Sequence, residues 1–335
     1  MMDHAEILDR LRAFQRKVRD VVTQSRDAGS LHEVSRVSWA DTIYKIDTDV
    51  DPILEQFCEE WGQTMPLVLV AEGLEDQSGR EVDYRVFPHG ASESDAKIRV
   101  IVDPIDGTRG IMYDKRPAWA LAGVAPNKGR ATKLSDIEIA VMTELPTSKM
   151  GFADVLWAVK GRGANGIRQD LRTGESRPLT LAPSRADSID HGFAMISNFF
   201  PGTKVLSSEM MEFLVKDLIG PADVTRATVF EDQYISTGGQ FYELIVGHDR
   251  FNADLRPTFY RMQNQPEGMC CHPYDCATML IAQEAGVVLT DDRGNPLDGP
   301  LDTTTGISWI GYANAALRDK IAPLMQQFFR SKGPQ

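Results

Sequence analysis

Residues 98–108 read Ile-Arg-Val-Ile-Val-Asp-Pro-Ile-Asp-Gly-Thr, and this stretch says more about the fold than any other part of the chain. Its first five residues are rich in β-branched side chains and predict a buried strand, which Pro104 should end because proline cannot donate to a ladder. Asp103, Asp106 and the carbonyl of Ile105 would then stand at the mouth of a sheet. Hard cations bind such oxygen donors, and the amides of a following helix N-terminus suit phosphate.

The composition is that of a soluble globular protein: of 335 residues, 42% are apolar and 25% are charged. The formal net charge of −12 argues against a nucleic-acid partner or an anionic membrane. Residues 1–24 lack the apolar core of a signal peptide, and their apolar side chains recur at the spacing of an amphipathic helix. The longest apolar stretch, around 119–125, is too short to span a membrane. We therefore expect a cytoplasmic protein.

Three of the four cysteines cluster around a histidine, in the order Cys270, Cys271, His272 and Cys276. Such a cluster raises the question of a zinc site, but no second pair of ligands stands at the spacing of structural zinc sites. Reduced, partly buried thiols in a reducing compartment are the favoured interpretation.

Outside the motif, strand and helix signals alternate irregularly, which favours a layered α/β fold over one doubly wound sheet. Asp51-Pro52 predicts a helix cap followed by the first helical position. The glycine-rich residues 160–166 lack the helix and the Lys-Ser/Thr of a phosphate-binding loop, so a hairpin turn is favoured. We expect an N-terminal half over 1–180 and a C-terminal half over 181–335. Strands are predicted over 67–70, 118–125, 138–142 and 155–159, helices over 53–61, 209–218 and 314–329, a helix and strand over 275–290, and a loop or hairpin over 73–97.

Further carboxylates follow other predicted elements. Glu72 ends the apolar run 67–70 as Asp103 ends its own strand, so both would emerge at one sheet edge if the two strands are neighbours. Asp275 stands near the start of a predicted helix, where it is either an N-cap or a metal ligand, and Gly286 fits the C-cap. Converging carboxylates of this kind can hold two cations, which lower the barrier to phosphate-ester hydrolysis.

The hexapeptide 103–108 resembles the signature of the inositol monophosphatase family, magnesium-dependent phosphomonoesterases related to fructose-1,6-bisphosphatase. Tyr274-Asp275-Cys276-Ala277 is similar to the second signature of that family, in the proper order along the chain. The resemblance implies an α-β-α-β-α sandwich, two or three Mg²⁺ ions per site, a small phosphorylated metabolite as substrate, lithium sensitivity and a homodimer.

The resemblance also implies a role for individual residues. The metals would be held by Glu72, Asp103, the Ile105 carbonyl, Asp106 and Asp275. Water would be activated by Glu72, Thr108 and Asp47, although Asp49 and Asp51 are alternatives to Asp47. Substrate and phosphate would be bound by Asp106, Gly107, Thr108, Arg109, Glu243 and Asp275.

Three features depart from the family pattern. Ala71-Glu72-Gly73 keeps one acid where the family often has two, and the other two features leave the substrate open. Arg109 resembles the histidinol-phosphate phosphatase branch, and residues 247–272 form a longer connection than usual, which could be a lid or a subunit interface. A nucleotide 3′-phosphatase and a fructose-1,6-bisphosphatase are further alternatives. A catalytically silent metal- or phosphate-binding relative is the non-enzymatic alternative, and a structural partner protein has no support beyond residues 247–272.

Overall fold

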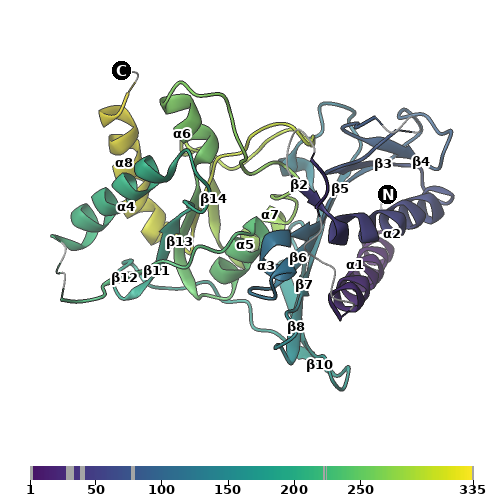
Figure 1. The fold of residues 1–335 in the computed structure, drawn as a ribbon, viewed down its shortest axis with the longest axis horizontal. Helices are drawn as coiled ribbons and strands as arrows, with labels where there is room; N and C mark the ends of the chain where they lie inside the picture. Colours follow the sequence, from purple (N-terminus) through teal and green to yellow (C-terminus); the bar gives the residue numbers. More distant parts are fainter. Residues whose placement is uncertain are drawn as a thin grey trace.

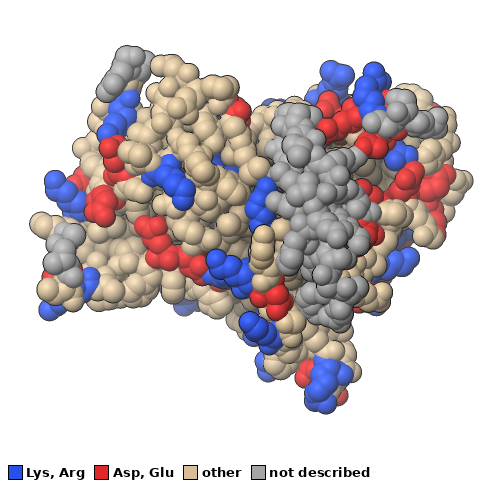
Figure 2. Space-filling model, viewed as in Figure 1, with Lys and Arg blue, Asp and Glu red and all other residues tan. Residues whose placement is uncertain are grey.

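The computed structural model describes residues 3–27, 34–37, 42–76, 80–221, 223 and 225–333, with the side chains of 26, 27, 34–37, 42–45, 47 and 48 outside that description. Two sheets and their helices alternate in layers across the molecule (Figure 1). None of the described helices is long and apolar enough to cross a membrane. Basic and acidic side chains are intermixed over the face that Figure 2 shows.

The larger sheet has eight strands in the order β10-β9-β8-β7-β6-β5-β3-β4. All its neighbouring strands are antiparallel except β3 and β5, which run parallel. Both faces of its centre are covered, so these strands are nearly continuous apolar runs. The strands are β3 (Leu67–Ala71), β4 (Arg85–Phe87), β5 (Ile98–Asp106), β6 (Ala118–Pro126), β7 (Ile139–Leu145), β8 (Phe152–Val159), β9 (Ala164–Asp170) and β10 (Ser176–Pro178).

The smaller sheet has five strands in the order β12-β11-β13-β15-β14. Its strands are β11 (Gly192–Ile196), β12 (Val229–Phe230), β13 (Asp249–Asp254), β14 (Val288–Thr290) and β15 (Trp309–Tyr312). A separate pair, β1 (Val34–Val37) and β2 (Thr42–Tyr44), is antiparallel.

Helices form the other three layers. Two of them, α1 (His4–Asp27) and α2 (Lys45–Gly62), lie on the outer face of the larger sheet, while α5 (Thr237–Ile245) and α7 (Met279–Ala285) lie between the sheets. The far face of the smaller sheet carries α4 (Lys204–Ile219) and α8 (Ala315–Ser331). The expected α-β-α-β-α sandwich is therefore confirmed. The short helices are α3 (Thr108–Met112), α6 (Arg256–Met262) and the 3₁₀ turn Leu134–Asp136.

The N-terminal helix forms where the apolar spacing predicts it. Ile7, Leu11, Phe14, Val18 and Val22 are buried along one stripe of α1, against the outer face of the larger sheet. A stripe of this width is what holds a surface helix to a sheet.

Several sequence-based expectations are wrong in detail. Strand β5 does not stop at Pro104 but continues to Asp106. A bulge between Asp103 and Asp106 interrupts the ladder at this point, so the ladder needs no hydrogen bond from Pro104, which has no N–H to donate. Asp51 is not a helix cap, because α2 begins at Lys45 and carries Pro52 inside it.

Other expectations are confirmed or corrected by the sheets. The segment 160–166 is a hairpin turn, since β8 and β9 pair antiparallel on either side of it. Residues 73–97 contain a short strand, β4, beside β3. The connection 247–272 is not a lid throughout: its first part is β13, which lies buried between two neighbours in the smaller sheet.

Candidate active site

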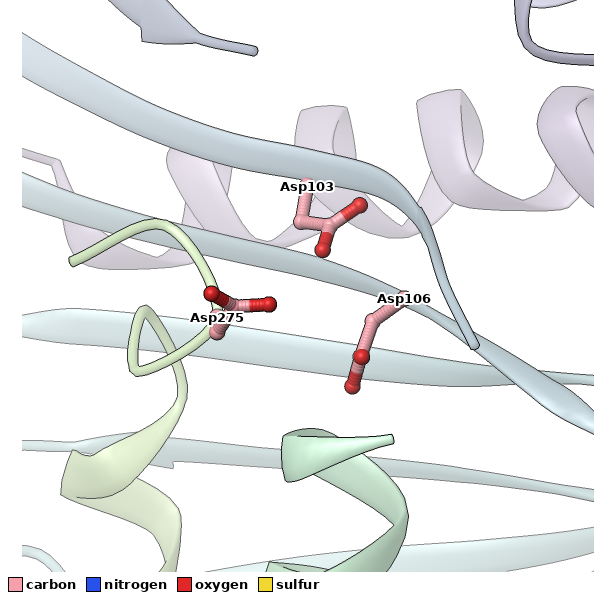
Figure 3. A group of neighbouring side chains, drawn as sticks. All are labelled: Asp103, Asp106 and Asp275. Atoms are coloured by element: carbon pink, nitrogen blue, oxygen red, sulfur yellow. The ribbon is translucent and has the colours of Figure 1, made fainter. Parts of the chain in front are cut away.

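Three carboxylates converge where the ends of the larger sheet meet the helices between the layers. Asp103, Asp106 and Asp275 each offer an oxygen, and these oxygens all lie within 4.8 Å of one another. The first two extend from the end of β5 and the third from the loop before α7 (Figure 3). Asp103 and Asp106 are 7% and 5% exposed, so their charges are largely out of water.

The N-terminus of α5 holds Asp106. Its carboxylate accepts hydrogen bonds from the Ser236 hydroxyl at 2.8 Å and from the backbone amides of Thr237 at 3.2 Å and Gly238 at 2.5 Å. Ser236 is the N-cap of α5 and also accepts from the Gly239 amide at 2.8 Å. A helix N-terminus suits a negative charge, so α5 fixes this carboxylate in place.

The bulge of β5 shapes the rest of the motif. The Asp103 carboxylate accepts from the Ile105 amide at 3.0 Å, and the Thr108 hydroxyl donates to the Ile105 carbonyl at 2.8 Å. Gly107 has φ of 96°, a left-handed conformation, and a Cβ there would lie 3.1 Å from the Cβ of Ser236. Helix α3 then begins at Thr108, directly after this glycine.

Asp275 is oriented by the loop that precedes it. Its carboxylate accepts from the His272 amide at 2.6 Å, and the His272 ring lies 3.1 Å from the Tyr274 hydroxyl and stacks on the tyrosine ring. The alternative of a plain helix cap is wrong, because α7 begins at Met279 with Thr278 as its N-cap. Gly286 does adopt the left-handed C-cap conformation predicted for it.

The electrostatics of the three carboxylates favour a bound cation. Burial raises the pKa of Asp103 well above its usual range, and the nearby charges of Asp106, Asp275 and Glu72 raise it further. Burial also raises the pKa of Asp275 well above its usual range, with Asp106 adding to the effect. Burial raises the pKa of Asp106 to about 6, although the hydrogen bonds from α5 oppose the rise. Repulsion of this kind is relieved when a multivalent cation binds.

Glu72 lies at the same sheet edge as Asp103. Strands β3 and β5 are parallel neighbours with Ala71 opposite Val102, so the next residue on each strand is one of these acids. Glu72 lines the cavity above the three carboxylates. The two acids were expected at one sheet edge if their strands are neighbours, and the pairing of β3 with β5 confirms that condition.

Two arginines and two phenylalanines line the same cavity as the carboxylates. The Arg109 guanidinium lies 5.3 Å from the centre of the Phe200 ring, and that of Arg256 lies 4.9 Å and 5.3 Å from the Phe199 and Phe200 rings. Arg256 is itself held by Asp254, with Nε donating to the carboxylate at 2.9 Å. The cavity is lined by Glu72, Asp103, Ile105, Asp106, Gly107, Thr108, Arg109, Phe199, Phe200, Ile235, Ser236, Thr237, Arg256, Met269, Cys270, His272, Tyr274 and Asp275.

The remaining predicted residues lie elsewhere. Glu243 does not line this cavity; it stands in the last turn of α5, where it pairs with His248 at 2.5 Å. Asp47 belongs to α2, and its side chain lies outside the described part of the chain. The four cysteines are free and buried, and Cys270 is at the cavity wall.

Sequence reasoning missed the residues that hold the site in place. Arg256, Phe199 and Phe200 carry no local signature, and only the arginine lies in a segment that stood out by its length. Ser236 did carry a signal, since a serine before a helix is a preferred N-cap.

The donor set fits a hard divalent cation. Carboxylate oxygens from three positions, with Glu72 and the Ile105 carbonyl on the same cavity, are the ligands that Mg²⁺ prefers, and among the described residues no thiol or imidazole belongs to the cluster.

No family model matches the chain. A curated relative from Methanothermobacter thermautotrophicus, named fructose-1,6-bisphosphatase/inositol-1-monophosphatase, is 23% identical over 270 residues, which are 77% of this chain and 81% of the relative.

Solved structures share the fold over nearly all of the chain. An inositol monophosphatase of Thermotoga maritima has a TM-score of 0.62 at 15% identity, covering 98% of this chain and 100% of its own. Leishmania major fructose-1,6-bisphosphatase has a TM-score of 0.65 at 15% identity, covering 96% of this chain and 93% of its own. The chain is thus similar to members of the inositol monophosphatase/fructose-1,6-bisphosphatase superfamily, in sequence over most of its length and in its layered fold.

Proposed function

We propose that this protein is a Mg²⁺-dependent phosphatase that hydrolyses a small phosphate monoester. The observation that carries the proposal is the buried cluster of Asp103, Asp106 and Asp275, whose oxygens lie within 4.8 Å of one another in a cavity that also contains two arginines. The activities named for its relatives, on fructose 1,6-bisphosphate and inositol monophosphate, support the same class of reaction.

The donors around the cavity would hold two or three Mg²⁺ ions, with Glu72 and the Ile105 carbonyl completing the carboxylate cluster. Bound magnesium supplies a Lewis acid that makes water more acidic and offsets the charge of the phosphate.

The protein groups provide orientation and charge. The cluster lies at the N-terminus of α5, which keeps Asp106 fixed, while Asp103 is held by the Ile105 amide. Glu72 would take the proton of the attacking water, and the Thr108 hydroxyl, which lines the same cavity at the start of α3, would assist. Arg109, at the cavity wall, would bind the phosphate oxygens or a second anionic group of the substrate.

Release of phosphate from a panel of monoesters tests the proposal. We expect hydrolysis in Mg²⁺ and loss of at least about a hundredfold in EDTA, because the water is no longer activated. The panel contains inositol monophosphate, histidinol phosphate, a nucleoside 3′-phosphate and fructose 1,6-bisphosphate, which separate the subclasses in one experiment. Full activity in EDTA contradicts a metal-dependent reaction, and no activity on any ester favours a silent relative.

Lithium is expected to inhibit the same reaction, as its resemblance to the inositol monophosphatase family implies. The measurement is a lithium dose series at fixed Mg²⁺, with potassium as the matched salt control. Equal rates in both salts would remove the protein from the lithium-sensitive branch while leaving the metal-dependent chemistry intact.

A further inference from the structure

A second group of buried charges lies between the larger sheet and α5, outside the set of residues that line the cavity around Asp103. Thr143 pairs with Val155, so the next positions on β7 and β8 place Glu144 beside Asp154. Glu144 is 7% exposed and Asp154 is 1% exposed, and a Glu144 oxygen accepts from the Asp154 amide at 3.0 Å. Two carboxylates side by side on neighbouring strands repel each other, and burial strengthens the repulsion.

The positive charge beside these two acids is that of Arg168, on β9. Its guanidinium donates to both oxygens of Asp154, from Nε at 2.7 Å and from Nη2 at 2.6 Å. This bidentate pair neutralises Asp154 and leaves Glu144 without a matching charge. Burial raises the pKa of Glu144 to about 8, and the neighbouring Asp154 charge adds to the effect. Glu144 is therefore the acid of the two that holds a proton.

The remaining charged and titratable groups on the elements around Glu144 do not supply the missing positive charge. Strand β6 carries none. Helix α5 adds the acid Glu243, which pairs with His248 and whose charge also raises the pKa of Glu144. Arg19 belongs to α1, on the outer face of the sheet, where it donates to Gln169 at 2.7 Å. The other groups are two phenols whose pKa burial raises and one acid at the far end of β8: Tyr234, Tyr242 and Glu284.

The same acids anchor α5 to the larger sheet. The Tyr242 hydroxyl, in the second turn of this helix, donates to Asp154 Oδ2 at 2.6 Å, and the tyrosine ring centre lies 4.7 Å from that of Trp119. The N-terminus of α5 holds Asp106 through the Ser236 hydroxyl and two backbone amides. Because a short helix moves as one body, a shift at Tyr242 also shifts the donors to Asp106.

We propose that Glu144 is a positioning residue: its protonated form keeps α5 seated on the larger sheet, and its ionisation displaces α5 and weakens Mg²⁺ binding at Asp106. The inference rests on the proposed function, because it takes the carboxylate cluster to bind Mg²⁺. An ionised Glu144 would repel both Asp154 and Glu243, and Glu243 stands on α5 itself. The repulsion therefore acts on the helix that holds Asp106.

Calorimetric titration of Mg²⁺ into the wild type and into Glu144→Gln, at pH values below and above about 8, tests this role. Glutamine still accepts from the Asp154 amide but does not ionise, so the two proteins should bind Mg²⁺ equally at the lower pH values. Above about pH 8 the wild type should bind Mg²⁺ about fivefold more weakly than the variant. The metal ligands titrate alike in both proteins, so the difference between the two reports Glu144.

Matched variants make the result specific. Glu209→Gln removes an exposed carboxylate from α4 and should bind Mg²⁺ as the wild type does at every pH. Tyr242→Phe removes the hydroxyl that joins α5 to Asp154, so it should weaken Mg²⁺ binding about fivefold even at the lower pH values. Tyr312→Phe, a buried change in the smaller sheet, should not. Circular dichroism verifies folding, and if Glu144→Gln does not fold, Tyr242→Phe gives the answer.

Two results would overturn the proposed role of Glu144. One is the same pH dependence of Mg²⁺ affinity in Glu144→Gln and the wild type, and the other is a Tyr242→Phe variant that binds Mg²⁺ as the wild type does. Either result leaves the proposed phosphatase function intact as long as the wild type binds Mg²⁺. A wild type that binds no Mg²⁺ at any pH overturns the proposed function as well.

Discussion

Asp103→Asn is expected to lower Mg²⁺-dependent phosphate release by a factor on the order of a thousand, because an uncharged amide binds a hard cation much more weakly than a carboxylate does. The nearby charges of Asp106 and Asp275 both raise the pKa of Asp103, and the three side chains offer oxygens within 4.8 Å of one another. Steady-state hydrolysis of the best ester of the panel measures the loss. Asp217→Asn, an exposed change on α4, is the matched control and should retain full activity.

The same variant has an opposite effect on the metal-free protein. Since the folded-state pKa of Asp103 is raised, the stability that this carboxyl contributes is complete below its unfolded pKa and is lost as the pH rises through its folded pKa. Asparagine does not ionise, so in EDTA the melting temperature of Asp103→Asn should exceed that of the wild type by an amount that grows with pH. A gap that shrinks as the pH rises would show that the carboxylates do not repel one another.

Asp254→Asn is expected to destabilise the protein by about 3 kcal/mol or more, because it leaves the buried Arg256 charge without its partner. The Asp254 and Arg256 side chains are 1% and 6% exposed, and the guanidinium donates to both carboxylate oxygens, at 2.9 Å and 3.0 Å from Nε. Urea unfolding in Mg²⁺-free buffer measures the change in the free energy of unfolding.

Two control variants test whether the loss of stability comes from the unpaired buried charge. Asp319→Asn breaks the exposed contact with Arg318 and should change the free energy of unfolding by less than about 1 kcal/mol. The double variant Asp254→Leu/Arg256→Met removes both charges and should recover much of the lost stability. If Asp254→Asn unfolds at the same urea concentration as the wild type, the pair does not stabilise the fold.

The local parts of the site could be predicted from the sequence. The strand before Asp103, the turn at Gly107 and the helix start at Thr108 all follow from neighbouring residues, whose spacing fixes where each side chain emerges. To predict that Glu72 and Asp103 share a sheet edge, one must also know that β3 pairs with β5 in parallel, which only the structure shows.

Helix α5 shows why the rest could not be predicted. Gly238 and Gly239 count against a helix by propensity, yet both are required by tertiary contacts. A Cβ on Gly238 would lie 2.5 Å from Leu121 and 2.9 Å from the Asp106 carboxylate, and one on Gly239 would lie 2.4 Å from the Tyr234 ring. Leu121 and Asp106, which are distant in sequence, determine Gly238, so no local pattern contains that information.

The prediction of where α2 begins was wrong for a related reason. Asp51-Pro52 is a good local signal for a helix start, but Val50 and Leu54 on either side of it are both buried in the core that α2 forms with α1 and the larger sheet. Burying Val50 and Leu54 stabilises this part of the helix by more than the loss of the backbone hydrogen bond that Pro52 cannot make costs.

The dependence of Asp106 on α5 has a consequence for synthesis of the chain. Ser236, which caps α5 and binds Asp106, lies 130 residues further along the sequence. At 5–20 residues per second, about ten seconds of translation separate the two. During that interval the inner face of the larger sheet, including Leu121 and Met142, has no α5 or α7 to cover it. The nascent chain therefore exposes an apolar surface for longer than most domains take to fold, which makes it a ready client for a chaperone.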